Sequence, residues 1–272
     1  MVIDLYKFYN DVRKKIGRDA MYIICDTFSV SKAEVLSAKK VDVSSEDYNK
    51  ANKLISRREN KEPLQYLIGK CEFYDNTYKV GKGVLIPRAD TEISLETALN
   101  LCEDNMRVAD LCSGSGCIAL SLKKANQSLE VFAYELFDDA LYYLKENAKN
   151  IGADINIIKG DVTTKLTSIQ FDIVISNPPY LTNEDMCSLQ EEVRYEPKTA
   201  LYGGKDGLDF YKKITQIWKD NIKENGYLIF EVGQNQHEAV KEIMQENGFC
   251  EIEFIKDLSK IIRTVKGKRR KN

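Results

Sequence analysis

Histidine and closely spaced cysteine pairs are nearly absent from this 272-residue sequence. His237 is the single histidine, and the seven cysteines are scattered without a Cys-x-x-Cys pair. This scarcity excludes most zinc sites and any Ser-His or Cys-His nucleophile system. An odd number of cysteines, several of them inside apolar runs, is typical of reduced thiols in a cytoplasmic protein. We therefore expect no metal centre, and we interpret His237, in a polar helix start, as a surface residue.

Long apolar segments are also missing. No stretch approaches the ~18 apolar residues that a membrane-spanning helix needs, and residues 1–7 lack the basic and apolar regions of a signal peptide. The sequence therefore predicts a cytoplasmic protein that has no membrane partner.

A strong excess of positive charge is absent as well, because the net charge is −2. Five basic residues crowd the end of the chain: Lys266, Lys268, Arg269, Arg270 and Lys271. Without them the remainder would carry about −7, which makes it an acidic globule. A cleft for duplex DNA needs a basic face, so nucleic acid is not a required partner. We expect the basic tail to be a solvated terminus that frays.

The pattern of apolar residues changes near residue 69. Residues 1–69 show helical spacing, with a capping box at Ser31 and Glu34 and a further cap at Ser44 or Ser45. Residues 70–88 have the form of a hairpin and connector. Strands then alternate with helices, and this pattern predicts an α/β fold with a parallel sheet. The expected strands are 107–112, 130–135, 155–159, 171–176 and 226–232, followed by an antiparallel edge pair at 250–256 and 261–266. The expected helices lie near 116–126, 138–150, 207–223 and 236–247.

A glycine-rich turn follows the strand 107–112 and opens the next helix. Glycines at this point let a ligand approach the backbone at a helix N-terminus, and an acid at the end of the following strand can accept from both ribose hydroxyls. Asp110, at the strand tip, would repel a pyrophosphate but attract an ammonium or sulfonium group. Ribose, ammonium and sulfonium together describe S-adenosylmethionine. The residues predicted to hold it here are Asp110, Cys112, Ser113, Gly114, Ser115, Gly116 and Glu135.

Asp161 and Val162 follow the third predicted strand and complete this cofactor site. The Asp161 carboxylate could accept from an adenine amino group while Val162 covers the ring. An equally reasonable interpretation makes Asp161 a helix N-cap.

Four residues with distinctive chemistry, Asn177, Pro178, Pro179 and Tyr180, end the apolar strand 171–176. The prolines restrict the backbone and offer no N–H, so this stretch presents carbonyl oxygens beside the Asn177 side-chain oxygen. Two such acceptors can hold the N–H bonds of a planar NH2 group while the Tyr180 ring stacks on its plane. A rigid Pro-Pro turn with Asn177 as a local cap is the alternative.

These two motifs together resemble the methyltransferases that act on planar NH2 nitrogens. The flanking segments resemble the bacterial protein-glutamine methyltransferases that modify peptide-chain release factors, the HemK/PrmC family. The matching segments are residues 63–69, Phe73, and residues 85–92, 193–197 and 200–208. The sequence departs from the family pattern at Ala89, where a second proline is usual, and in lacking an Asp directly before Arg263.

The resemblance implies a seven-stranded, Rossmann-like, S-adenosylmethionine-dependent methyltransferase domain over residues 89–272, behind a helical domain at 1–69 that recognises the release factor. The substrate would be the glutamine of a Gly-Gly-Gln loop, the product S-adenosylhomocysteine, and the enzyme a monomer. Catalytic roles would fall to Asn177, Pro178 and Tyr180, with Asn177 also near the cofactor. The implied substrate contacts are Asn177, Pro178, Pro179, Tyr180, Phe73 and Arg88.

Three other functions fit parts of the pattern. An adenine amino-group methyltransferase acting on DNA or RNA would use the same four residues, with a flipped base on Tyr180. A nicotinamide-dependent oxidoreductase is supported by the glycine pattern alone. A noncatalytic binding module would require the acceptors at 177–180 to be structural.

Overall fold

The computed structural model describes residues 1–165 and 167–270, and the chain divides into two compact units. Unit 1 comprises Met1–Lys70 together with Gln190–Tyr195, and unit 2 holds the remainder. The connector predicted at 70–88 groups with unit 2 from Cys71 onward. The inclusion of Gln190–Tyr195 in unit 1 was not expected, because these residues are far from residues 1–70 in sequence.

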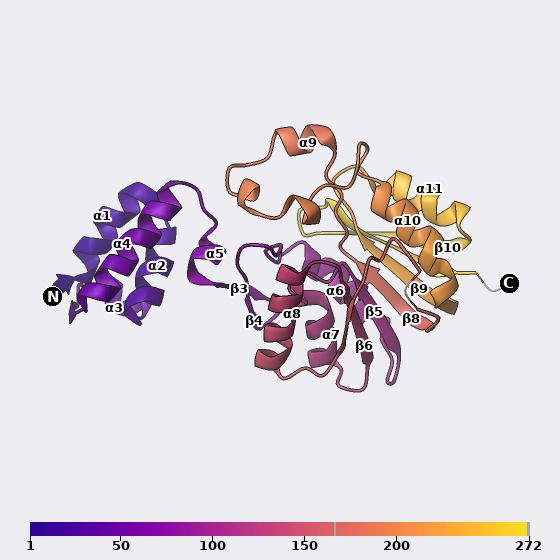
Figure 1. Ribbon diagram of the computed structural model, residues 1–272, viewed down its shortest axis with the longest axis horizontal. Helices are drawn as coiled ribbons and strands as arrows, with labels where there is room; N and C mark the ends of the chain where they lie inside the picture. The colour runs from indigo at the N-terminus through magenta and orange to yellow at the C-terminus, as the bar shows by residue number, and fades with distance from the viewer. Residues whose placement is uncertain (166, 271–272) are drawn as a thin grey trace. The chain divides into compact units, whose positions relative to one another are not determined.

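Unit 1 is a small helical bundle, and its residues 1–70 are drawn in indigo and violet in Figure 1. Its elements are β1 (Val2–Asp4), α1 (Leu5–Ile16), α2 (Asp19–Phe28), α3 (Lys32–Leu36), β2 (Lys40–Asp42), α4 (Ser45–Glu59) and α5 (Leu64–Ile68), with the 3-10 turn η1 (Val193–Tyr195). The capping box of Ser31 and Glu34 is present at α3, and Ser44 caps α4. The short antiparallel pair β1–β2 was not predicted.

The segment Gln190–Tyr195 is held in unit 1 by polar contacts. Arg58 donates to Glu192 and to Asp19, both at 2.6 Å, and the Tyr195 hydroxyl donates to the Asn60 carbonyl at 2.8 Å. These contacts are made by single charged and hydroxyl groups, which produce no periodic pattern in a sequence. The sequence therefore gave no sign that Gln190–Tyr195 contacts residues 1–70.

Unit 2 is built on one sheet. Among the described residues the sheet has seven strands in the order β10-β11-β9-β8-β5-β6-β7, in which β10 and β11 run antiparallel to their neighbours and the other pairings are parallel. Its strands are β5 (Arg107–Leu111), β6 (Glu130–Glu135), β7 (Asn156–Lys159), β8 (Phe171–Ser176), β9 (Ile222–Glu231), β10 (Phe249–Lys256) and β11 (Ile262–Arg269). The predicted α/β class and antiparallel edge pair are confirmed.

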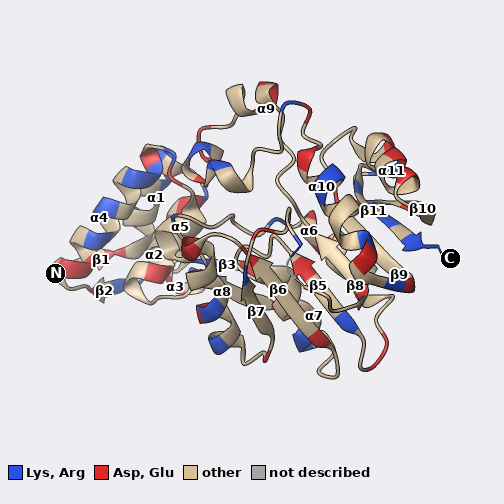
Figure 2. Ribbon diagram, turned by 45° about the vertical axis from the view of Figure 1, so that its right-hand side comes forward, with Lys and Arg blue, Asp and Glu red and all other residues tan. Residues whose placement is uncertain are grey.

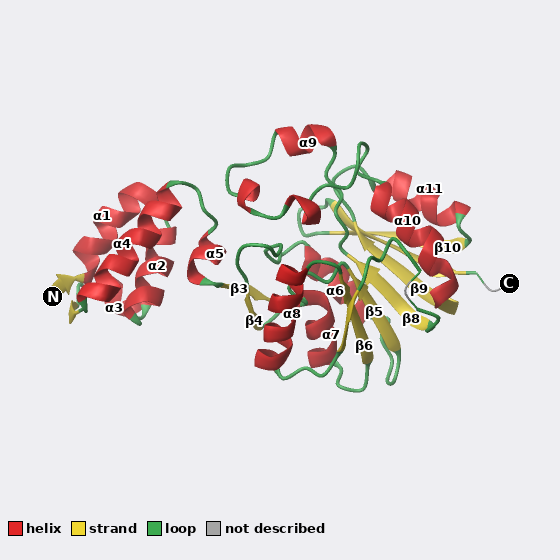
Figure 3. Ribbon diagram, in the orientation of Figure 1, coloured by secondary structure: helices red, strands yellow, loops and turns green. Residues whose placement is uncertain are grey.

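Helices cover both faces of this sheet, as the colours of Figure 3 show. The remaining elements are β3 (Lys70–Phe73), β4 (Asn76–Lys79), α6 (Thr91–Leu99), α7 (Cys117–Ala125), α8 (Asp138–Ile151), α9 (Asn183–Cys187), η2 (Lys198–Ala200), α10 (Asp209–Trp218), η3 (Lys219–Asn221) and α11 (His237–Glu246).

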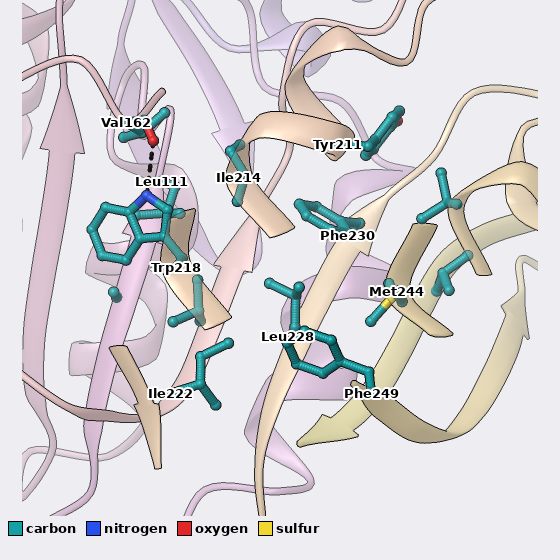
Figure 4. Packing of buried hydrophobic residues seen from close by; sticks show 14 of the residues in the cluster. Leu111, Val162, Tyr211, Ile214, Trp218, Ile222, Leu228, Phe230, Met244 and Phe249 are labelled. Carbon is teal, nitrogen blue, oxygen red and sulfur yellow. Dashed lines mark hydrogen bonds between the residues drawn. The ribbon is translucent and has the colours of Figure 1, made fainter. Parts of the chain in front are cut away.

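The core of unit 2 has two halves, because successive strand residues point to opposite faces of the sheet. One half packs α10 and α11 against the sheet around Trp218 and Phe230 (Figure 4), and the other packs α6, α7 and α8.

The prediction of a helix over 207–223 was wrong at its end. The helix α10 stops at Trp218, and the next strand already begins at Ile222, four residues before the predicted start. Ile222 is buried and pairs with Phe171 on β8. Packing in the core therefore extends the strand beyond the apolar run that is visible in the sequence. No helix in the described part of the chain is long and apolar enough to cross a membrane.

The basic end of the chain is not the frayed tail that the sequence predicted. Strand β11 continues to Arg269 and ends in basic residues (Figure 2). Lys266 and Lys268 pair with Glu253 and Glu251 on the neighbouring strand β10, at 3.2 and 3.6 Å. Opposite charges on adjacent strands stabilise such a pairing, so charge density alone was a poor guide to disorder here. Lys271 lies outside the described residues.

Candidate active site

A cavity of about 630 Å³ opens in unit 2 where β5, β6 and β8 end. Its walls come from five segments: the connector after β4, the glycine-rich turn after β5, the turns after β6 and β7, and the chain that follows β8. Ligands of open parallel sheets bind outside the carboxyl ends of the strands, and the cavity occupies this position. Of the predicted site residues, those that line it are Arg88, Cys112, Ser113, Gly114, Ser115, Glu135, Asp161, Val162, Asn177 and Pro179.

The two glycines of the turn have different tasks. Both have positive φ, 56° at Gly114 and 82° at Gly116. A Cβ on Gly116 would lie 2.2 Å from the Leu144 side chain, so this glycine lets α7 pack against α8. A Cβ on Gly114 would meet only Val84, at 4.0 Å, and Gly114 lines the cavity. Gly114 is therefore the position at which a ligand can approach the backbone closely.

Glu135 ends β6 and faces this turn. Its Oε2 accepts from the Gly114 N–H at 2.8 Å, and its Oε1 accepts from the N–H groups of Leu136 and Phe137 at 2.7 and 2.9 Å. Three backbone donors fix the carboxylate on the cavity wall. A carboxylate has about four lone-pair sites, so it keeps capacity for a hydroxyl donor such as those of a ribose.

Asp110 lies behind the turn and is only 1% exposed. Its Oδ2 accepts from the Ala119 N–H at 3.2 Å, whereas Oδ1 is buried and has no hydrogen-bond partner within residues 1–165 and 167–270. Burial, followed by a smaller contribution from Glu135, raises the pKa of this carboxyl to about 7. A buried acceptor without a donor is costly, and a cationic ligand in the cavity would stabilise it. Asp110 itself does not belong to the cavity wall, so its predicted contact with an ammonium stays a prediction.

The turn after β7 contributes Asp161 and Val162. The Asp161 Oδ1 accepts from the Thr163 N–H at 2.9 Å and from the Thr163 hydroxyl at 2.7 Å. Residues 161–164 form a turn, so the alternative that Asp161 caps a helix was wrong. The Val162 carbonyl accepts from the Trp218 indole N–H at 2.8 Å, which ties the cavity wall to the core (Figure 4).

Asn177 comes directly after β8 and lines the cavity together with Pro179. Its Nδ2 donates to the Thr91 hydroxyl oxygen at 3.2 Å. An amide that donates through nitrogen on one side presents its oxygen on the other. The position fits the predicted acceptor role.

Pro178 and Tyr180 are placed differently from Asn177. Pro178 is buried, and neither residue belongs to the cavity wall. The Tyr180 carbonyl accepts from the Gln236 side chain at 2.9 Å, and burial raises the pKa of the Tyr180 hydroxyl. The structure thus fixes the backbone of this segment, while stacking of the ring on a substrate stays a prediction.

Arg88 lines the cavity and donates to Glu196. The Glu196 carboxylate is buried, also accepts from the Ile86 N–H at 2.9 Å, and has its pKa raised by burial. This pair joins the connector to the chain that follows η1. Glu196 was not among the predicted site residues, although it lies in a segment that carried the family resemblance.

Comparisons of the whole sequence agree with this geometry. A family model described as "Methyltransferase small domain" matches residues 91–201, and one described as "PrmC N-terminal domain" matches residues 14–69. A release factor glutamine methyltransferase of Thermodesulfovibrio yellowstonii is 38% identical over 254 residues, which cover 91% of each chain. One of Clostridium acetobutylicum is 39% identical, over 78% of this chain and 76% of the relative. The chain belongs to the release factor glutamine methyltransferase family.

A solved structure shares the fold of this chain. The crystal structure of a methyltransferase from Pyrococcus furiosus superposes with a TM-score of 0.55 at 18% identity, over 81% of this chain and all of that chain. At this identity the likeness concerns the fold alone. The seven-stranded methyltransferase architecture predicted from the sequence is confirmed.

Phe73, another predicted substrate contact, lies in the core. Its side chain is 2% exposed and packs edge-on against Tyr78, with ring centroids 6.0 Å apart. It belongs to the core between the hairpin and the helices α6 to α8. Its burial disagrees with the predicted substrate contact and makes Phe73 part of the packing that supports the connector.

The two departures from the family pattern lie in one ion-pair cluster. Arg263 contacts Asp257 and Asp90, each at 3.0 Å. Asp257 is in the turn between β10 and β11, so it provides a carboxylate near Arg263 although none stands directly before it in the sequence. Asp90, next to Ala89, is thereby fixed at the start of α6. A sequence motif cannot show that a carboxylate six residues before Arg263 contacts its side chain.

Sequence reasoning missed several residues of this site besides Glu196. Thr91 accepts a hydrogen bond from Asn177 and lines the cavity. Lys198 and Lys213 also line the cavity. Glu231 is buried at the end of β9. Glu231 could have been found from the sequence, since it is an acidic residue at the end of an apolar strand. Glu135 was identified from the same arrangement.

Proposed function

We propose that this chain transfers a methyl group from S-adenosylmethionine to the side-chain amide nitrogen of a glutamine in peptide-chain release factors, the glutamine being that of the Gly-Gly-Gln loop. One observation carries the proposal. Asn177, an amide acceptor, and the Gly114 turn with Glu135 lie on the wall of the same cavity. Family membership supports the same reaction.

The residues present fit S-adenosylmethionine. Bound there, it supplies an electrophilic methyl group on a sulfonium. Glu135 would hold the ribose hydroxyls, Asp161 and Val162 the adenine, and the orphaned Oδ1 of Asp110 would accept from the ammonium. Each assignment gives a described polar atom a partner of complementary charge or hydrogen-bonding type.

The protein must orient the glutamine amide and does not need to deprotonate it. The nitrogen lone pair of an amide is delocalised, and no carboxylate can remove its proton at neutral pH. Asn177 Oδ1 and the Pro178 carbonyl would accept the two N–H bonds and aim the nitrogen at the methyl group. Positioning of this kind contributes up to roughly 7–11 kcal/mol in ideal intramolecular reactions. The same acceptors stabilise the positive charge that grows on the nitrogen, and the proton leaves to water afterwards.

The helical unit gives the second part of the proposal. Residues 1–70 contribute nothing to the cavity wall, and the family model for the N-terminal domain matches there. We assign recognition of the release factor to this unit.

A methyl-transfer assay with an intact release factor tests the function. Mass spectrometry should place one added methyl group on the glutamine, and a factor with glutamate at that position should accept none. A site built around hydrogen bonds rejects a side chain that lacks the NH2 by about 10⁴–10⁵ in kcat/KM. Methyl label on adenine in nucleic acid, with none on the factor, would instead establish an adenine methyltransferase.

A further inference from the structure

A buried carboxylate, Glu231, lies directly behind Asn177 and is not used by the reaction as described so far. Strands β8 and β9 are parallel neighbours in which Ser176 pairs with Phe230. The next residues along the two strands, Asn177 and Glu231, therefore stand at the same level of the sheet. Glu231 is 3% exposed, and its Oε2 is buried without a hydrogen-bond partner in the described part of the chain. An acid in such a position costs stability, so a function for it should be sought.

Thr91 and Asn177 lie beside Glu231. Both side chains are near enough to the Glu231 carboxylate to lower its pKa. Asn177 Nδ2 donates to the Thr91 hydroxyl oxygen at 3.2 Å. The nitrogen end of the Asn177 amide thus has Thr91 as its partner on the protein side, and the register of β8 and β9 places the Glu231 carboxylate beside it.

We propose that Glu231 is a positioning residue that holds the Asn177 amide with Nδ2 toward the protein and Oδ1 toward the cavity. An ionised carboxylate can only accept hydrogen bonds. If the amide rotated by half a turn, two acceptor oxygens would face each other in a buried site, so the ionised form of Glu231 selects one orientation. The catalytic use of Oδ1 rests on the proposed function, but the orientation itself does not.

Several groups determine the charge of Glu231. Burial has the largest effect on the pKa of Glu231 and raises it, and the charge of Asp90 raises it further. Thr91, Arg263 and Asn177 lower the pKa, and the result is a value of about 7. Below this pH the protonated carboxyl can donate to Oδ1, so either amide orientation becomes satisfied. The titratable and charged groups that act on Glu231 or feel its charge are Asp90, Cys117, Tyr180, Tyr211 and Arg263.

Nuclear magnetic resonance tests the orientation without any substrate. The side-chain NH2 signals of Asn177, assigned by their loss in Asn177→Ala, should shift with pH in the wild-type enzyme with a midpoint near 7. In Glu231→Gln they should not titrate in this range. Asn177 signals that are insensitive to pH in the wild type, or that still titrate near 7 in Glu231→Gln, would overturn the proposal.

Turnover at saturating S-adenosylmethionine gives the second test. We expect Glu231→Gln to lower kcat roughly three- to tenfold, because the amide loses its fixed orientation and position, and to change the cofactor KM less than about twofold. The wild-type kcat should fall toward the variant's value as the pH drops below about 7. In an Asn177→Ala background Glu231→Gln should lower kcat no further. An equal fractional loss in that background would show a merely structural role.

A matched control lies on the adjacent strand. Thr264 on β11 pairs with Glu231 in the sheet, and its buried hydroxyl is 2.7 Å from that of Ser94. Thr264→Val removes a buried hydrogen bond at the same level of the sheet, and it should lower stability while leaving kcat and its pH profile unchanged. Should Glu231→Gln fail to fold, Thr91→Val removes the other partner of Asn177 and must lower kcat for the proposal to stand.

The two proposals can fail separately. If the wild-type enzyme does not methylate a release factor but the Asn177 signals titrate as expected, the proposed function is wrong and the positioning role stands. If methylation occurs and the signals do not titrate, the positioning role alone is wrong.

Discussion

Carboxylates in two regions of the same sheet differ in burial and in pairing. At the site, Asp110 and Glu231 are buried, each has an oxygen without a partner among the described residues, and the pKa of each is raised to about 7. On the β10–β11 edge, the side chains of Glu251 and Glu253 are 65% and 60% exposed and each pairs with a lysine. A buried acid without a full set of donors costs stability, whereas exposed pairs contribute little. Buried acids with raised pKa values are candidates for a functional role, so this difference marks Asp110 and Glu231 as residues to test.

The largest expected effect falls on the site side of this comparison. Asn177→Ala should lower turnover by about 10²–10³, the usual cost of one preorganised hydrogen bond. Cofactor affinity should change little. Steady-state kinetics combined with calorimetric titration of the cofactor measure both quantities. Near-normal turnover would refute the role given to Asn177.

The pH dependence of stability provides the next largest effect. The native state binds the Glu231 proton more tightly than the unfolded chain, because burial raises the pKa from its ordinary 4.5 to about 7. The contribution of Glu231 to stability is therefore most favourable below pH 4.5 and declines as the pH rises to 7. Glu231→Gln removes this decline. Between pH 4.5 and pH 7 the free energy of unfolding of the variant should therefore rise relative to that of the wild type, by up to about 3 kcal/mol. Denaturant unfolding at about pH 5 and pH 7.5 measures the difference, and a constant gap between the two proteins would contradict the cost assigned to this acid.

Asp110→Asn separates stability from binding. The amide keeps an acceptor for the Ala119 N–H but has no charge for a cationic ligand. S-adenosylmethionine should bind about 10–100-fold more weakly, the loss of one charge-assisted hydrogen bond of roughly 1.5–3 kcal/mol. Stability above pH 7 should rise, since a buried charge has been removed. Weaker binding accompanied by lower stability would mean that Asp110 is mainly structural.

The smallest expected effect lies at the β10–β11 edge. Lys268→Ala removes one half-exposed ion pair with Glu251, and it should change the free energy of unfolding by about 0.5 kcal/mol or less. Turnover should be unaffected. Thermal unfolding at low and high salt checks this. A loss of several kcal/mol would show that the edge depends on its charges more than its exposure indicates.

Periodicity and turn chemistry were sufficient for most of the local elements, though not for the pair β1–β2 or for the boundary between α10 and β9. The capping box at Ser31, the alternation of strands and helices, and the motifs at Gly114 and Asn177 follow from side-chain period, backbone freedom and hydrogen-bonding capacity within a few residues. Each of these properties belongs to a short segment, so the sequence by itself determined the α/β fold and the two motifs that contribute to the cavity wall.

Only the tertiary structure decided which side chains meet. Burial placed Phe73 in the core, pairing with β10 made the basic end of the chain part of the sheet, and Asp257 was brought into contact with Arg263. Glu231 was brought behind Asn177 by the pairing of β8 with β9. Such contacts join residues far apart in the chain, and their energies depend on desolvation and on the surrounding charges. These quantities exist only once the chain has folded, so no local pattern could predict them.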